Sequence, residues 1–257
     1  MVKSLFSAAA LLLGTLPAPA ENPPATAPAP SRPATPSSKP ADAPKPDAPP
    51  APAIKSLGGP RYELNGITFN GDTRAITLPA TVNMTEGLLE YALVHESGKV
   101  HESLLSTPIS PYDLNVVLLL LNYQPSATFF DTSDQAAGAV LVRNPKIEAQ
   151  AKLLVTLDWK DPAGKAHTAL LETLLLNIDQ KAPAKDGPFV YTGSMLMEDG
   201  TFMAKETGSI LALYADASAL LNNPRQGNEN DDNWLADKSK VPPKGTTVTV
   251  TLTPAPK

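Results

Sequence analysis

The chain has 257 residues, including 28 Pro and no Cys, and its 26 acidic and 21 basic side chains give a formal charge of −5. Without cysteine sulfur, iron–sulfur clusters, zinc ribbons, thiol catalysis and disulfide scaffolds are excluded. The basic residues are spread thinly through an acidic chain and give no focused positive field, so we expect neither a nucleic acid nor an anionic membrane as partner.

The first twenty residues have the pattern of a secretory signal peptide. Lys3 supplies the positive start, residues 5–16 form an apolar stretch, and residues 18–20 form a small-residue cleavage site. The apolar stretch is about 12 residues, well short of the roughly 20 that a membrane-spanning helix needs. We therefore expect cleavage near Ala20, export to the periplasm or beyond, and no stable membrane insertion.

Residues 21–53 contain 12 Pro and nine Ala and have no aromatic or large aliphatic side chain. Such a segment cannot bury enough surface to offset the entropy lost on ordering, so we predict a disordered Pro/Ala-rich tail or linker. Two interpretations stay open: a spacer that reaches through the envelope, or a solvated tail without a partner. Residues 54–257 are long enough for a single β-rich globular domain, and no Pro/Gly/Ser linker divides them.

Strand patterns dominate this domain, and turn-forming residues between them predict four hairpins. The turns are expected at 70–73, 96–99, 161–164 and 198–201. The last of these hairpins is expected to pair residues 189–197 with 202–205. Near the C-terminal end, Val248, Val250 and Leu252 alternate with threonines, which is typical of a half-buried strand.

One helix is well signalled at about residues 110–122. Ser110 is the expected N-cap, Pro111 occupies the first helical position, and Asp113 follows before an apolar run to Leu121. Apolar residues fall on every side of this helix, which predicts burial between layers. A shorter helical turn is expected at 215–221. The predicted fold class is α+β, a mainly antiparallel β-sheet with one buried helix.

The tripeptide His-Glu-Ser occurs twice, at residues 95–97 and 101–103, and suggests a metal or catalytic site. In the second predicted hairpin, His95 faces Val100, so His95 and His101 fall on opposite faces of the ribbon. We therefore expect that the two imidazoles cannot share one ion.

The third histidine, His167, is expected opposite Asp158 in the third hairpin. An imidazole beside a carboxylate suits a general base, but it is also an ordinary cross-strand pair, which we favour because no nucleophile is tied to it by spacing. No phosphate-loop, dinucleotide or Gly-x-Ser-x-Gly pattern occurs, so an enzyme is not indicated.

Residues 228–233 gather oxygen ligands that calcium prefers, and Glu229, Asp231 and Asp232 are weak metal candidates. The Gly and the bidentate Glu that an EF-hand loop requires are missing, so a solvated acidic loop is the favoured interpretation. We expect neither a metal nor a cofactor.

Several separated segments, in order, resemble the YdjY-like domain family of exported bacterial proteins, from about Arg61 to Pro254. The segments are GLLEY (87–91), GKVHESLL (98–105), DL (113–114), FVYTGS (189–194), NNP (222–224), DDNW (231–234) and VPPKGT (241–246). The resemblance implies an envelope location and a single domain with no assigned biochemical role. Members of the family often carry His where this chain has Asn115. That difference lowers the expectation of metal binding or acid–base catalysis at His101.

The leading hypothesis is an exported, non-catalytic module that binds a small polar ligand or another envelope component. The candidate ligand-binding residues are His101, Glu102, Ser103, Asn115 and Glu90. An alternative is a metal-dependent or hydrolytic enzyme centred on the His101-Glu102 strand. A further alternative is a purely structural envelope protein.

Overall fold

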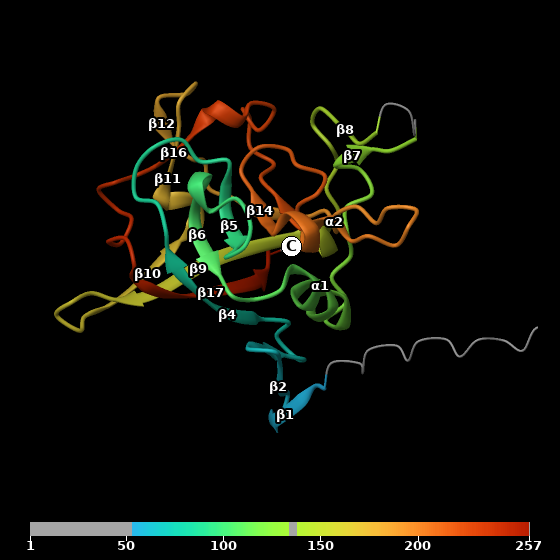
Figure 1. Cartoon of the computed structure of the whole chain (residues 1–257), viewed down its shortest axis with the longest axis horizontal. Coiled ribbons are helices and arrows are strands. Elements are labelled where there is room, and N and C mark those ends of the chain that lie inside the picture. Colours follow the sequence, from blue (N-terminus) through green and yellow to red (C-terminus); the bar gives the residue numbers. More distant parts are fainter. Residues whose placement is uncertain (1–52, 134–137, 257) are drawn as a thin grey trace, which may run out of the picture. The chain divides into compact units, whose positions relative to one another are not determined.

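The computed structural model describes residues 53–133 and 138–256 (Figure 1). The predicted signal peptide and the predicted tail, apart from Ala53, lie outside the described residues. Among the described residues, no helix has both the length and the apolar character needed to cross a lipid bilayer.

Eight strands pair in a closed ring. Their order around the ring is β4, β17, β9, β13, β15, β14, β5, β6 and back to β4. Their bounds are β4 (Ile76–Val82), β5 (Tyr91–His95), β6 (Ser103–Thr107), β9 (Lys152–Lys160), β13 (Phe189–Tyr191), β14 (Ser209–Ala212), β15 (Leu221–Asn222) and β17 (Thr247–Pro254). The described domain is therefore built around a β-barrel.

The expected α+β fold, a mainly antiparallel sheet with one buried helix, is wrong. The barrel is mixed, because β5 pairs with β6 and β14 with β15 in parallel while the other neighbours in the ring are antiparallel. Helix makes up only 14 % of the structure. Period-2 alternation shows which residues face the core, but it does not show which strand is the neighbour or in which direction that strand runs.

The second predicted hairpin is also wrong, since β5 and β6 run parallel. The connection at 96–102 crosses back along the barrel and includes a 3₁₀ turn at Val100–Glu102. His95 therefore lies beside Thr107 and not beside Val100. His101 is not on a strand at all, so the prediction that the two imidazoles occupy opposite faces of one ribbon rested on a pairing that does not form.

Close packing of two glycines accompanies this crossing. A Cβ atom on Gly98 would lie 2.9 Å from the Thr207 carbonyl oxygen, and one on Gly208 would lie 2.8 Å from the Gly98 Cα. Gly208 also has a φ of +74°, which L side chains rarely adopt. Gly98 is thus required for backbone contact, and not for a tight hairpin turn.

Additional strands extend the ring or form small separate sheets. β1 (Lys55–Gly58), β2 (Arg61–Leu64) and β3 (Ile67–Asn70) continue outward from β4, and β10 (Ala166–Leu170) pairs with β9. A three-stranded sheet contains β12 (Ala182–Pro183), β11 (Leu175–Asn177) and β16 (Trp234–Ala236), and a two-stranded sheet contains β7 (Phe130–Asp131) and β8 (Val140–Leu141).

Of the other three predicted hairpins, two are confirmed and one is wrong. The first is confirmed by β3 and β4, with Phe69 opposite Ile76, and the third by β9 and β10. The fourth is wrong beyond one bridge between Leu196 and Phe202, because the next residues form helix α2 (Met203–Thr207). The helical turn expected at 215–221 is wrong as well, since this segment turns and enters β15.

Helix α1 (Pro111–Leu120) confirms the predicted start at Pro111, with Ser110 at the N-cap position. The prediction of complete burial is wrong. Leu114, Val117 and Leu118 pack into the core, whereas Leu119 is 51 % exposed. Within residues 53–133 and 138–256, 3₁₀ turns also occur at Ala149–Ala151, Leu171–Leu174 and Asp231–Asn233.

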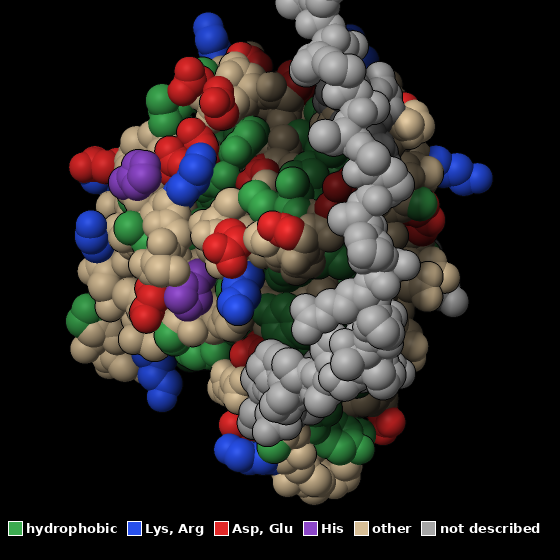
Figure 2. All heavy atoms as spheres, turned by 45° about the vertical axis from the view of Figure 1, so that its right-hand side comes forward, with side chains coloured by type: hydrophobic (Ala, Val, Ile, Leu, Met, Phe, Trp, Pro, Cys, Tyr) green, Lys and Arg blue, Asp and Glu red, His purple; other side chains and the backbone are tan. Residues whose placement is uncertain are grey.

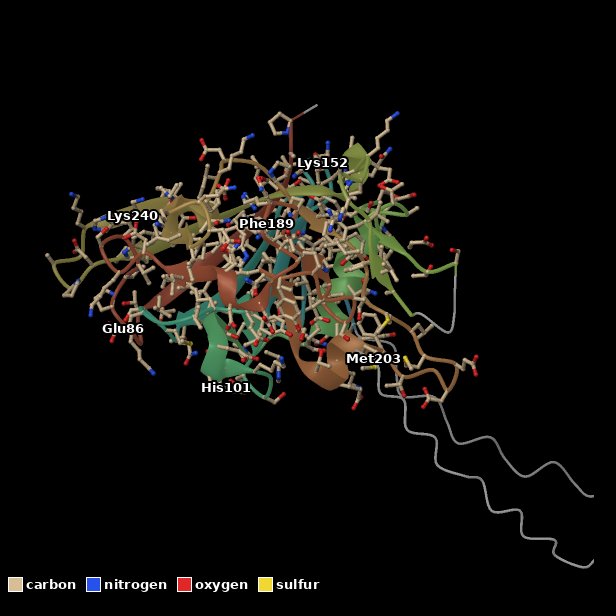
Figure 3. All side chains as sticks on the ribbon, turned by 90° about the horizontal axis from the view of Figure 1, so that it is seen from above. Glu86, His101, Lys152, Phe189, Met203 and Lys240 are labelled. Carbon is tan, nitrogen blue, oxygen red and sulfur yellow. The ribbon has the colours of Figure 1, made fainter. Side chains whose placement is uncertain are left out.

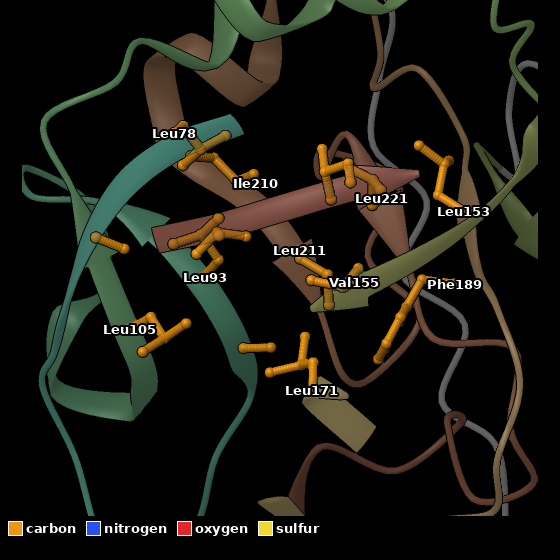
Figure 4. Packing of buried hydrophobic residues seen from close by; sticks show 14 of the residues in the cluster. Leu78, Leu93, Leu105, Leu153, Val155, Leu171, Phe189, Ile210, Leu211 and Leu221 are labelled. Carbon is orange, nitrogen blue, oxygen red and sulfur yellow. The ribbon is translucent and has the colours of Figure 1, made fainter. Parts of the chain in front are cut away.

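The core is filled by the inward side chains of the ring (Figure 4). Leu153, Val155 and Leu157 alternate with more exposed residues along β9, and the half-buried strand predicted at 247–253 is confirmed by the same alternation in β17. Full burial of a large aliphatic side chain contributes roughly 1.5–3 kcal/mol. This buried cluster therefore stabilises the barrel strands, and the strands in turn hold the ends of the polar loops in position.

Candidate functional site

Two carboxylates share one ammonium group at the start of β5. Lys99 Nζ lies 3.0 Å from Glu90 Oε2 and 3.0 Å from Glu102 Oε1. The backbone explains the encounter, because the Glu90 amide donates to the Glu102 carbonyl at 2.9 Å, beside the 3₁₀ turn. The resulting trio, called here the Glu90 cluster, is partly exposed, with side-chain exposures of 23 % for Glu90 and 19 % for Glu102.

The pKa of one carboxyl group in the Glu90 cluster, that of Glu90, is raised. Burial raises the pKa of Glu90, and the hydrogen bond from Lys99 only partly opposes this effect. Burial acts to lower the pKa of Lys99, but hydrogen bonds with Glu102 and Glu90 outweigh burial and raise it. Lys99 therefore stays cationic at neutral pH and is unsuited to act as a base or nucleophile.

Two tyrosines adjoin the cluster. Lys99 Nζ lies 5.2 Å from the centre of the Tyr91 ring. The Tyr91 hydroxyl lies 3.0 Å from the Tyr214 hydroxyl and donates to Asp216 at 3.0 Å. Burial strongly raises the pKa of Tyr91, and the Asp216 charge adds to this effect, so the phenol remains a hydrogen-bond donor.

The structure brings together only part of the candidate set named from the sequence. His101 is at the margin of the Glu90 cluster: its side chain is 78 % exposed and its Nε2 lies 3.7 Å from Glu102 Oε2. Buried Ser103 donates its hydroxyl to the Lys99 carbonyl at 2.6 Å and so orders the turn. Asn115 is engaged elsewhere, because its side-chain oxygen accepts from the Tyr191 hydroxyl at 2.6 Å.

His167 pairs with a different carboxylate from the one expected. Its Nε2 lies 2.9 Å from Asp161 Oδ2, and this hydrogen bond is the main cause that lowers the pKa of Asp161. Trp159, not Asp158, is the cross-strand neighbour of His167, and the two rings stack with centroids 5.4 Å apart. The one-residue difference arises because the connecting loop spans 161–165.

Two of the three weak metal candidates take part in local hydrogen bonds, one through its carboxylate and one through its backbone amide. Glu229 accepts from the Gly227 amide at 3.1 Å, and the Asp232 amide donates to the Asn230 side chain at 3.1 Å. Within residues 53–133 and 138–256, no group of three or more His, Asp or Glu side chains is arranged to hold a metal ion.

A cavity of about 450 Å³ lies beside β13, the β11–β16 pair and the loop at 224–226. Its size falls within the range of small-molecule sites. The cavity is lined by Ile147, Lys152, Asn177, Gln180, Lys185, Asp186, Gly187, Pro188, Val190, Pro224, Arg225, Gln226 and Trp234. It is called here the Arg225 cavity.

Arg225 is the most constrained charged group of this wall. Its side chain is only 8 % exposed, donates to the carbonyls of Lys185 at 2.6 Å and Gly187 at 2.5 Å, and lies over the Phe189 ring at 4.4 Å. Buried Glu172 supplies the counter-charge, with Oε1 3.7 Å from Arg225 Nη2. Burial lowers the pKa of Arg225 while Glu172 opposes that shift, and a guanidinium stays charged in this setting.

The wall of the Arg225 cavity carries an excess of positive charge, although the whole chain is acidic. Lys152, Lys185 and Arg225 face only Asp186 among the lining carboxylates. Among the described residues, neither lysine forms an ion pair, whereas Arg225 is balanced by Glu172. Such a cavity favours a ligand with negative charge.

The sequence reasoning missed the Arg225 cavity, although one signal pointed toward it. Buried asparagines build the adjoining loops: Asn223 accepts from Arg225 Nη1 at 3.0 Å, and Asn233 donates to the Gly227 carbonyl at 3.1 Å. Both residues belong to segments on which the family resemblance was based. Asparagines placed among hydrophobic strands signal fixed loops, and fixed loops are where binding sites are commonly built.

The residues that line the Arg225 cavity do not include His101 or any member of the Glu90 cluster. Figure 3 labels Lys152 on one side of the ribbon and His101 on the other. The described cavities are lined by residues other than Glu90, His101 and Glu102. The two candidate places must therefore be weighed separately.

A family model described as YdjY domain matches residues 67–253, which is more than half of the chain. The chain belongs to the YdjY domain family. No curated protein and no solved structure matches it. The match to the YdjY domain covers both the Glu90 cluster and the Arg225 cavity, so both places are part of the family's own domain.

Proposed function

We propose that this YdjY domain is an exported, non-catalytic binding module that holds a small anionic ligand in the Arg225 cavity. The observation that carries the proposal is the pair of lysines, Lys152 and Lys185, which line a 450 Å³ cavity beside a buried arginine. The proposed export is supported by the signal-like pattern of residues 1–20 alone.

The Arg225 side chain in the wall of the cavity is held in place before any ligand binds. Because the Arg225 guanidinium is held by two carbonyls and an aromatic ring, little side-chain entropy remains to be lost when a ligand arrives. The two lysines supply charge without fixed geometry, which suits carboxylate or phosphate groups on a flexible ligand. A dicarboxylate is the simplest ligand that would engage both lysines.

The test compares three four-carbon probes that differ in charge: succinate, neutral succinamide and cationic putrescine. Each is titrated into the full chain, and binding is followed by the NMR signals of the Arg225 Nε–H and the Trp234 indole N–H. We expect saturable shifts with succinate alone at millimolar concentration. Equal shifts with all three probes, or none with succinate, would contradict the proposal.

A charge-matched pair of variants separates the cavity from general surface charge. We expect Lys152→Gln/Lys185→Gln to raise the succinate dissociation constant about tenfold or more, through loss of charge-assisted contacts. Lys165→Gln/Lys244→Gln makes the same charge change at exposed positions outside the cavity. Equal weakening by both double variants would show that the wall has no special role.

A second candidate function, acid–base hydrolysis, is favoured by the raised pKa of Glu90 beside Glu102. If it is correct, the purified chain should cleave members of a panel of nitrophenyl esters, phosphates and glycosides. Glu90→Gln should abolish that activity, while His101→Ala should leave it within about twofold because His101 lies at the exposed margin. No turnover of any probe would exclude hydrolysis of these bond types.

A further inference from the structure

Helix α1 exposes one apolar face while its other face packs into the core. Tyr112, Leu119 and Leu120 are 47, 51 and 49 % exposed. Tyr112 lies about two turns before the adjacent Leu119 and Leu120, on the side opposite Leu114 and Leu118, and Val116 lies between them, about one turn from each. A helix that is apolar on every side is normally covered on every side. The outward face of α1 is therefore unusual for a surface that meets only water.

The apolar surface continues beyond the helix. The Tyr112 ring meets the Phe202 ring edge to face, with centroids 6.0 Å apart. Phe202 bridges to Leu196, which is 72 % exposed, and Met197 beside it is 47 % exposed. Figure 2 shows hydrophobic side chains at the surface between charged ones on the side turned forward there. We call residues 112, 116, 119, 120, 196, 197 and 202 the α1 face.

We propose that the α1 face is the interface of a homodimer of this chain. If a fully exposed large side chain offers roughly 200 Å², the exposed fractions leave on the order of 500 Å² of apolar surface per protomer. A standard interface covers about 800 Å² per partner, of which about 65 % is apolar in homodimers. The apolar area available on the α1 face therefore matches what a stable dimer requires.

A second copy fits the α1 face better than a lipid surface does. The charged residues within four positions of it are Asp113, Glu198, Asp199, Glu206 and a single basic residue, Lys205. Helices that lie on anionic membranes instead carry several lysines and arginines around their apolar face. A twofold axis that passes beside the middle of α1 would pack the apolar stripe of one copy against the same stripe of the second copy, as in isologous dimers. Val116 would then lie closest to the axis.

The first experiment is sedimentation velocity of the full chain over a range of concentrations. We expect a dimer, and we expect Leu119→Glu/Leu120→Glu to raise the dissociation constant of the dimer at least about 100-fold, because the variant places two charges in each copy of the apolar stripe that the interface buries. Leu170→Glu/Ile178→Glu is the matched control, since both residues are 37 % exposed and outside the α1 face. A monomer at all concentrations, or dissociation of both variants, would overturn the proposal.

The second experiment uses the absence of cysteine from the chain. The Val116→Cys variant should be trapped as a covalent dimer by a short bis-maleimide, while Leu170→Cys should not. Crosslinking by both or by neither would overturn the proposed axis. Flotation with anionic vesicles tests the alternative that the α1 face binds lipid. If the chain sediments as a monomer and binds the vesicles, and Leu119→Glu/Leu120→Glu abolishes that binding, the α1 face is a lipid-binding surface and not a dimer interface.

Discussion

Replacing Arg225 by Met isolates the contribution of the buried ion pair beside the cavity. The substitution leaves the carboxylate of Glu172, a residue only 1 % exposed, without its cation and removes the hydrogen bonds to the carbonyls of Lys185 and Gly187. Breaking a buried pair from one side costs about 3–5 kcal/mol, since the remaining charge stays desolvated. For a domain of this size, that loss lowers Tm by roughly 6–20 °C.

Urea denaturation at neutral pH, followed by circular dichroism and tryptophan fluorescence, measures this loss. Glu172→Met/Arg225→Met removes both charges, so we expect it to be less destabilised than Arg225→Met alone. Lys55→Met is the control, because Lys55 and Glu63 form an exposed pair 3.4 Å apart that should contribute at most about 1 kcal/mol. The reasoning fails if Arg225→Met loses less than about 1 kcal/mol, or if the double variant is the least stable of the three.

Three further outcomes are expected. Gly208→Ala should lower the free energy of unfolding by about 2–4 kcal/mol in a urea titration, because a Cβ there meets the Gly98 backbone at 2.8 Å and the φ of +74° is strained; an unchanged midpoint would refute the close contact. Burial raises the folded-state pKa of Glu90, so its contribution to stability is present at low pH and is lost as pH rises through that pKa; the stability of Glu90→Gln relative to the parent should therefore increase as the pH rises above the ordinary pKa of glutamate, 4.5, and a flat difference would contradict the shift. His101→Ala should change stability by less than about 0.5 kcal/mol, as 78 % of that side chain is exposed, and a larger change by calorimetry would show contacts that the structure lacks.

Sequence patterns predicted local elements well and partners between elements poorly. The start of α1 at Pro111 and the alternation of β17 depend on neighbouring residues, and both are confirmed. The pairing of β5 with β6 depends on a crossing at 96–102 that is shorter than most parallel connections. The residues around Gly98 read the same in the sequence whether this glycine lies in a hairpin turn or packs against Gly208.

The candidate site was predictable in part for the same reason. Glu90 and Glu102 were chosen from the sequence and do converge, but Lys99, which joins them, was assigned to a turn. The Arg225 cavity unites residues far apart in the chain, from Lys152 to Trp234. No spacing rule connects such positions, so only the fold could bring them together.

The ring has a consequence for how the polypeptide acquires its structure. β17 is the last barrel strand in chain order, yet it lies between β4 and β9, two strands that come much earlier in the chain. Until β17 arrives, both of those strands present unpaired edges that invite association with other chains. Ring closure therefore follows synthesis of the whole domain, and contacts between such distant segments make the final step slow.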